Sequence, residues 1–223
     1  MNDSRQSSLL RSAAALGLVA LVGTALLAGV HHLTRERIAE QEKRVVLEQL
    51  QQIVNADEYD NDLHTDRFVF SNEPFFPNEQ QVVAYRARAN GAPVAVILRF
   101  SAVNGYNGAI GLLAGIREDG SLSGVRVTSH KETPGLGDAI ELAKSDWILA
   151  FSGKSLNNPP PDDWAVQRDD GAFDQFTGAT ITPRAVVEAV RLALEYYALN
   201  GDLLFEAPSD TNNIKPGAGG ELL

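Results

Sequence analysis

The sequence predicts an α+β protein in which an N-terminal transmembrane helix and a helical stalk precede a mostly antiparallel sheet packed with helices. Three observations lead to this prediction. Residues 12–30 contain no charged side chain, four strand-like segments between residues 82 and 128 are joined by turn signals, and apolar residues recur at helical spacing after residue 183.

The uncharged segment has the length of a membrane helix. At a rise of about 1.5 Å per residue it nearly spans a hydrocarbon core of about 30 Å. We therefore expect a transmembrane helix over residues 12–32, after an N-terminal tail over residues 1–11. A cleaved signal peptide is the alternative because Arg5 and Arg11 supply a basic start, but the run is longer than a signal core of about 7–15 residues. Basic residues flank it on both sides, so the positive-inside rule does not decide its orientation.

The segment after the membrane helix predicts a stalk. Over residues 33–56, apolar side chains recur at intervals of three to seven with charged side chains between them, as in an amphipathic helix. Residues 57–205 are expected to form the globular domain. The tail over residues 206–223 is rich in Gly, Pro and Asn, and we expect it to be disordered.

Strand signals in the globular domain come in two pairs. The four segments are 82–89, 94–100, 110–116 and 124–128. Asn90-Gly91 joins the first pair and is the strongest short hairpin signal, while Asp119-Gly120 marks the turn of the second pair. These segments predict two hairpins in one mostly antiparallel sheet. Pro93 is expected only on an edge strand or at the first position of its strand, because proline lacks the N–H that a ladder needs.

Two helical regions follow the predicted sheet. Residues 137–151 predict one broken helix or two short ones. Residues 183–200 form the clearest helix of the domain. Thr182 is expected as its N-cap, Pro183 as its first residue and Gly201 as its stop.

Composition excludes several classes of protein. The chain has no cysteine, so a disulfide framework, a zinc-thiolate site, an iron–sulfur cluster and a cysteine nucleophile are impossible. Residues 45–223 carry 13 basic and 25 acidic side chains. Such an acidic domain repels a phosphate backbone, so we expect no nucleic-acid partner. No metal site is expected either, because His130 and Glu132 lack a third ligand nearby.

The first stretch that can carry chemistry is "DQFTGATITP", residues 174–183. Gly178 and Ala179 are small enough for the backbone to approach a ligand. The helix that follows presents N–H groups and a positive dipole end that suit a phosphate, and Arg184 can add a cation. A Thr-rich helix cap is nevertheless the simpler interpretation of these residue types alone.

The second stretch covers residues 105–137 and ends in "HKETPGLG". Here His130 and Glu132 precede a rigid Pro-Gly turn and a further glycine. Glycine-rich loops beside polar groups often wrap a flat cofactor. They are also ordinary loops, and an ordinary loop is the simpler interpretation of this stretch taken alone.

Together, "GYNGAIGLLAGI", "SHKETPGLG" and the D-x-x-T-G-A-T run of Asp174–Thr180 resemble the FMN-binding domain of redox-driven ion pumps. This domain occurs in the G subunit of the Rnf (also called Rsx) electron-transport complex and in the C subunit of the sodium-translocating NADH:quinone reductase. The resemblance spans roughly residues 82–197, and the N-terminal membrane helix fits it. The short chain and the sequence "TGATITP" favour the Rnf protein.

The resemblance implies roles for individual residues. In the family, the last threonine of the D-x-x-T-G-A-T run is joined through its hydroxyl to the phosphate of FMN, which places covalent attachment at Thr180. Asp174, Thr177, Gly178 and Ala179 would be recognised by a separate flavin transferase that spends FAD. The other expected cofactor-binding residues are Tyr106, His130, Glu132, Thr133, Leu136, Thr177, Gly178, Ala179 and Thr182.

Residue chemistry refines these expected contacts. We expect Glu132 and Thr133 to bond near the polar edge of the flavin, Leu136 to lie against its face, and Tyr106 to stack on it or close the pocket. The redox chemistry belongs to the cofactor, while the protein supplies orientation and electrostatics. Acidic groups near the ring would lower its reduction potential by disfavouring the anionic hydroquinone.

The resemblance thus implies a membrane-anchored electron-transfer component of a complex that couples electron transfer to ion translocation, not a stand-alone catalyst. Its expected partners are the other membrane and peripheral subunits, the flavin transferase and the lipid bilayer. The expected location is the bacterial inner membrane, with a single span and the flavin domain on the periplasmic side. Two alternatives stay open: the C subunit of the quinone reductase, and a membrane-anchored ligand-binding or scaffold domain without flavin.

Overall fold

The computed structural model describes residues 16–18, 20–21, 23–24, 46–78 and 80–209. The chain divides into two compact units, Met1–Val45 and Val46–Leu223. The described residues of the first unit are helical. Across the described ranges, no helix is long and apolar enough to cross a membrane. Most of the expected transmembrane helix over residues 12–32 and the expected stalk before residue 46 lie outside the described residues, as does the tail after residue 209.

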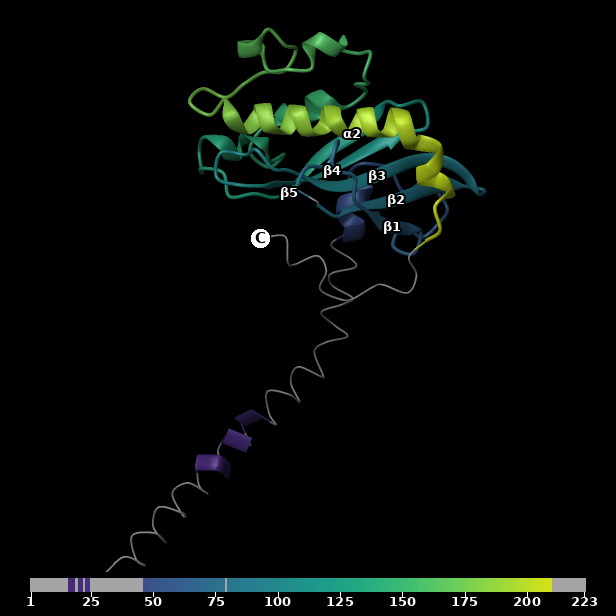
Figure 1. The fold of residues 1–223 in the computed structure, drawn as a ribbon, viewed down its shortest axis with the longest axis vertical. Coiled ribbons are helices and arrows are strands. Elements are labelled where there is room, and N and C mark those ends of the chain that lie inside the picture. Colours follow the sequence, from purple (N-terminus) through teal and green to yellow (C-terminus); the bar gives the residue numbers. More distant parts are fainter. Residues whose placement is uncertain (1–15, 19, 22, 25–45, 79, 210–223) are drawn as a thin grey trace, which may run out of the picture. The chain divides into compact units, whose positions relative to one another are not determined.

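The second unit is built on a five-stranded antiparallel sheet whose spatial order follows the sequence (Figure 1). Its strands are β1 (Arg67–Phe70), β2 (Val82–Ala89), β3 (Ala92–Ala102), β4 (Ile110–Arg117) and β5 (Leu122–Ser129). The four strands predicted from the sequence are confirmed as β2 to β5. The edge strand β1 was not predicted, because it has only four residues and no turn signal joins it to β2.

The β2–β3 hairpin turns where Asn90-Gly91 predicted it. Asn90 has φ 51° and Gly91 has φ 80°, the left-handed pair that a two-residue hairpin turn requires. The expectation for Pro93 is wrong, since it is the second residue of an internal strand. Proline is tolerated there because it lies opposite Arg88 at a β-bulge, and because β3 pairs with β4 only from Ala95 onward.

Both faces of the sheet are covered, so neighbouring residues of one strand, such as Ile97 and Leu98, are both buried. On one face, Leu98 and Leu112 pack against the apolar side of the long helix α2 (Ile181–Glu206). On the other face, Ile97 and Leu113 pack against Leu50 and its neighbours. Figure 1 shows α2 running along one face, with the short helical segment 46–51 lying against the opposite one. Residues 46–56, expected to end the stalk, thus begin the compact unit.

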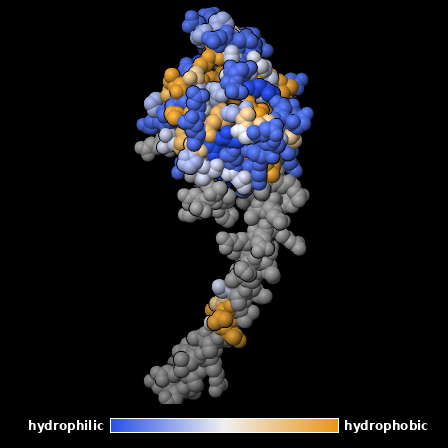
Figure 2. All heavy atoms as spheres, turned by 90° about the vertical axis from the view of Figure 1, so that its right-hand side faces the viewer, coloured by the Kyte–Doolittle hydropathy of each residue, from blue (hydrophilic) through white to orange (hydrophobic). Residues whose placement is uncertain are grey.

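The region between β5 and α2 is mostly loop with short 3₁₀ helices. Residues 137–151 form two short helices, η1 (Gly137–Ile140) and η2 (Asp146–Phe151), as the sequence predicted. Two further 3₁₀ turns, η3 (Pro161–Asp163) and η4 (Gln167–Asp169), follow in the loop. The face of the unit drawn in Figure 2 is mainly hydrophilic, with apolar patches between polar side chains.

Helix α2 differs from the prediction at both ends. Its N-cap is Thr180, not Thr182, which is the second helical residue and forms no cap. Gly201 does not stop the helix, which continues through Glu206, a residue that the sequence had assigned to the tail.

Two arginines of β2 hold the C-terminal end of α2. Arg86 is 2% exposed, pairs with Asp66 at 2.6 Å and donates to the Ala207 carbonyl. Arg88 pairs with the same carboxylate at 2.9 Å and donates to the Phe205 carbonyl at 2.6 Å. Cationic donors at a helix C-terminus satisfy carbonyls that lack helical partners. These contacts explain why the helix extends past Gly201.

Replacing Arg86 by Met should destabilise the protein strongly. The change leaves helix-end carbonyls without their buried donor, and breaking a buried pair costs roughly 3–5 kcal/mol. Because Asp66 keeps Arg88, we expect a loss of unfolding free energy of about 3 kcal/mol in urea titrations. The exposed Arg168 serves as the control, since the unfolding free energy of the Arg168→Ala variant should stay within about 0.5 kcal/mol of the wild-type value. Equal losses in the two variants would contradict this role.

Candidate functional site

The candidate site is centred on a tight turn just before α2. Ala179 N–H donates to the Phe176 carbonyl at 3.1 Å, and Gly178 has φ +83° at the third position of the turn. A positive φ at that position is the geometry of a type II turn and favours glycine. Thr177 and Gly178 are exposed at its tip.

Aromatic side chains pack against the base of this turn. Trp147, on η2, donates its indole N–H to the Asp174 carbonyl at 2.8 Å and packs edge-on against Phe176, with ring centroids 5.2 Å apart. The Asp174 carboxylate accepts a bond of 2.6 Å from the Gln167 side chain and stays exposed. The turn is therefore fixed at its base and open at its tip.

Thr180 lies at the junction of this turn and α2. Its backbone is already helical, with φ −75° and ψ −29°, and its hydroxyl makes no capping bond. Proline at position 183, the third helical residue, brings no N–H to the first turn. The amino end of α2 therefore offers N–H groups and a positive dipole end beside a hydroxyl that capping does not use. That combination can hold a phosphate attached to Thr180.

The glycine-rich loop meets the start of α2 through Glu132. This side chain is 4% exposed and accepts two hydrogen bonds. The Asn107 N–H donates to one carboxylate oxygen at 2.9 Å, and the Thr182 hydroxyl donates to the other. Asn107 also donates its side-chain amide to the Thr133 hydroxyl at 3.2 Å. Three segments far apart in sequence are thereby joined.

Close packing at these contacts requires glycine. A Cβ added at Gly137 would lie 2.9 Å from the Thr182 hydroxyl oxygen and 3.0 Å from the Glu132 Cβ. A Cβ added at Gly178 would lie 3.6 Å from the Leu136 side chain. The "HKETPGLG" loop and the "TGAT" turn are therefore neighbours in space, as a shared ligand requires.

Three large apolar side chains stay exposed on the segments that meet here. The exposed fractions are 65% for Tyr106, 43% for Leu136 and 44% for Ile181. Tyr106 precedes Asn107, Leu136 precedes Gly137, and Ile181 follows Thr180. Exposed apolar groups next to polar ones suit a flat, partly apolar ligand.

His130 and Glu132 have partners inside the protein. The His130 Nδ1 accepts the Glu132 N–H at 3.1 Å, and its Nε2 bonds the Glu141 carboxylate at 2.7 Å. Both ring nitrogens are thus engaged within the loop, and both Glu132 oxygens are engaged as described above. In this structure the two residues therefore support the site through hydrogen bonds within the protein.

Arg184, a candidate cation for a phosphate, forms a bidentate ion pair with Asp169. Its guanidinium donates to the two carboxylate oxygens at 2.6 and 2.9 Å. The hydrogen bond from Arg184 lowers the pKa of Asp169, and the same bond raises the pKa of Arg184. Both side chains are exposed, so water and salt screen this pair.

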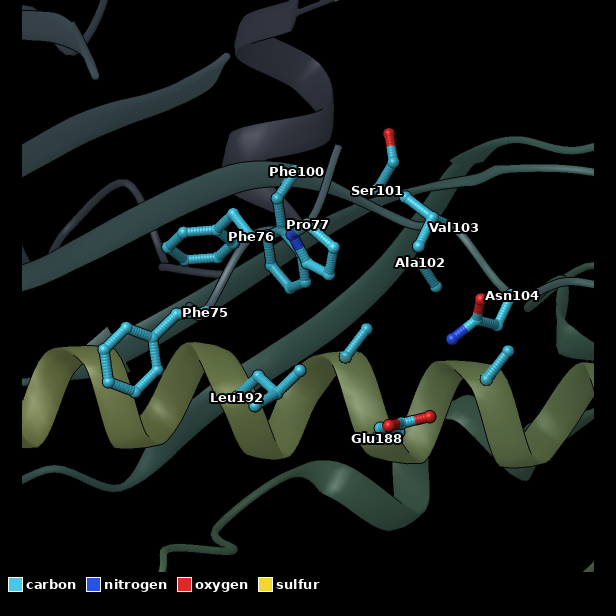
Figure 3. A pocket seen from close by; sticks show the side chains of 12 residues that line it. Phe75, Phe76, Pro77, Phe100, Ser101, Ala102, Val103, Asn104, Glu188 and Leu192 are labelled. Atoms are coloured by element: carbon cyan, nitrogen blue, oxygen red, sulfur yellow. The ribbon is translucent and has the colours of Figure 1, made fainter. Parts of the chain in front are cut away.

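The groove drawn in Figure 3 is separate from this site. It lies between α2, the loop carrying Phe75 and Pro77, and the end of β3, and Leu192 and Glu188 lie on its helix side. None of the candidate flavin residues lines it. The groove is therefore not part of the candidate site.

Sequence reasoning missed Asn107 and Gly137 as parts of the site. Both belong to the glycine-rich stretch that it singled out, but their importance depends on Thr182 and Glu132 meeting across 50 residues of chain. No local pattern contains that contact.

Comparison with known proteins identifies the class and then the family. A family model described as an FMN-binding domain matches residues 105–195, which include every candidate residue. A second model, described as the RnfG N-terminal region, matches residues 1–53. The protein is therefore of the class that carries an FMN-binding domain.

Its relatives are named as the G subunit of an ion-translocating oxidoreductase complex. One from Pseudomonas aeruginosa is 47% identical and covers 94% of this chain and 98% of its own. Relatives from Vibrio atlanticus and Pseudoalteromonas atlantica are 45% and 42% identical, covering 86% and 87% of this chain and 92% and 91% of their own. The chain belongs to the family of G subunits of ion-translocating oxidoreductase complexes.

Gly137→Ala should destabilise the protein because its methyl group would overlap the Thr182 and Glu132 side chains. Overpacking of this kind costs about 1–3 kcal/mol, which urea unfolding can measure. Gly124→Ala is the matched control, because an added Cβ there has no neighbour closer than 3.7 Å. It should change stability by about 0.5 kcal/mol at most. A neutral Gly137→Ala variant would show that these three groups do not pack as described.

Proposed function

We propose that this protein is a membrane-anchored electron-transfer subunit that holds FMN on Thr180 through a phosphoester. The family assignment supports FMN and membership of an ion-translocating oxidoreductase complex. The observation that carries the attachment site is the Thr180 hydroxyl, which stands at the amino end of α2 and makes no capping bond.

The proposed attachment transfers an FMN unit from FAD to this hydroxyl. The Thr180 oxygen bonds to the phosphorus of the FMN half, the phosphoanhydride bond of FAD breaks, AMP leaves and the hydroxyl proton is lost. The N–H groups and dipole at the start of α2 favour the resulting negative phosphodiester. Because a separate flavin transferase performs this step, its recognition sequence must be reachable.

The structure supports that access. Asp174, Thr177 and Gly178 are exposed, while Ala179 and Thr180 are half-buried. The transferase can therefore contact the turn without unfolding the domain. Asp174 acts through its carboxylate or through the loop that Gln167 and Trp147 hold in place.

Once bound, FMN supplies a centre that accepts one or two electrons. Tyr106 and Leu136 offer exposed apolar surface for the ring, and Thr133 offers a hydroxyl at the loop's edge. Gly178 and Ala179 leave room for the ribityl phosphate beside the turn. The loop and the first turn of α2 are fixed by hydrogen bonds among His130, Glu132 and Thr182, which thus contribute indirectly.

The same proposal places the protein in the bacterial inner membrane. Residues 12–32 would form a single membrane helix, with the flavin domain on the periplasmic side, and the uncharged run from residue 12 to residue 30 supports such an anchor. Other subunits of the complex would receive or deliver the electrons. The name shared by the relatives supports the existence of those subunits.

Thr180→Ala should abolish covalent flavin. Full-length wild-type protein co-expressed with a flavin transferase should give a fluorescent band in a denaturing gel under ultraviolet light and a mass increased by FMN less one water. The Thr180→Ala chain should be dark and unmodified, because it lacks the accepting oxygen. Thr65→Ala, a threonine far from the turn in sequence whose hydroxyl bonds the Asp62 carbonyl, should stay fluorescent. A dark wild type, or a fluorescent Thr180→Ala chain, would refute the proposed attachment.

A further inference from the structure

The Glu132 carboxylate is buried, and no cation among the described residues pairs with it. It is 4% exposed, and none of the ion pairs between described residues involves it. Its two hydrogen-bond donors, the Asn107 N–H and the Thr182 hydroxyl, are uncharged. Such donors and a helix amino end stabilise an anion but leave its negative charge in place.

The residue to which this carboxylate bonds lies close to the proposed attachment point. Thr182 is two residues beyond Thr180, and Leu136 and Gly178 bring the same loop against the turn. Burial keeps water and salt away from the carboxylate, so its field reaches further than that of an exposed carboxylate.

We infer that Glu132 is a positioning residue that acts on the flavin by its charge and by the contacts it holds. Through Thr182 and Asn107 it fixes the first turn of α2 against the glycine-rich loop. Its negative charge raises the free energy of reduced, anionic flavin and so lowers the reduction potential. This inference rests on the proposed attachment of FMN to Thr180, and it assigns Glu132 a different role from the ring-edge contact expected from the motif.

Glu132→Gln tests the charge because glutamine has nearly the same shape. Its amide oxygen can still accept the Asn107 N–H, and its NH₂ can bond the Thr182 oxygen. In FMN-loaded full-length protein, the equilibrium constant for two-electron reduction should rise at least tenfold. Potentiometric titration would record that change as a midpoint potential higher by at least about 30 mV.

Two variants separate the charge from the contacts. Thr182→Val removes a donor but keeps the carboxylate, so the potential should stay unchanged or fall. Glu118→Gln makes the same chemical change just after the last residue of β4, at the opposite end of that strand from the 105–109 loop, and should leave the potential unchanged. Intact-mass measurement would establish that each chain carries one FMN.

Each result then decides the inference. An unchanged potential in loaded Glu132→Gln protein overturns it, and so does an equal rise in the Thr182→Val protein, which would show that packing alone sets the potential. If Glu132→Gln fails to load, the Thr182→Val titration still decides, because a rise of about 30 mV or more contradicts a role for charge and an unchanged or lower value supports it. A wild-type chain without FMN would instead refute the proposed function, an outcome visible before any potential is measured.

Discussion

The hydrogen bond from the Thr182 hydroxyl to the Glu132 carboxylate joins the two halves of the site. Glu132 belongs to the loop after β5, and Thr182 to the first turn of α2. The bond holds Leu136 near the turn that presents Thr180, and it requires the missing side chain at Gly137. Because Asn107 donates to the same carboxylate, the loop after β3 is placed by this contact as well.

The position of Thr180 also depends on the whole length of α2. The amino end of the helix is tied to Glu132, and its carboxyl end to Arg86 and Arg88, with an apolar face packed on the sheet between them. A helix anchored in this way cannot slide along the sheet without breaking buried polar contacts. The Thr180 hydroxyl is therefore held by a rigid element, while Thr177 and Gly178 in the preceding turn stay exposed.

Local sequence signals predicted those parts of the fold that depend on residues close together in the sequence. Asn90-Gly91 predicted a hairpin because its left-handed turn needs those residues, and strand-like segments separated by turn signals predicted β2 to β5. The ends of α2 were predicted wrongly for the opposite reason. Thr182 obeys the local rule for an N-cap, but its hydroxyl bonds a carboxylate 50 residues away. Gly201 resembles a helix stop, but arginines on β2 stabilise the helix beyond it.

In the candidate site, too, local sequence predicted some features, and contacts between distant residues decided the others. The "HKETPGLG" and "TGAT" motifs indicated which segments meet, and the family resemblance singled out Thr180. They did not reveal that Glu132 and His130 would be engaged within the protein, because those contacts arise only when β5, η1 and α2 pack together.

The central claim is that the Thr180 oxygen carries FMN in the working protein. The most direct test is fragmentation mass spectrometry of the peptide containing residues 177–184, taken from protein purified from its native membrane. The account predicts an added mass of FMN less one water, located on Thr180. The same peptide unmodified, or carrying the flavin on Thr177 or Thr182, would contradict it.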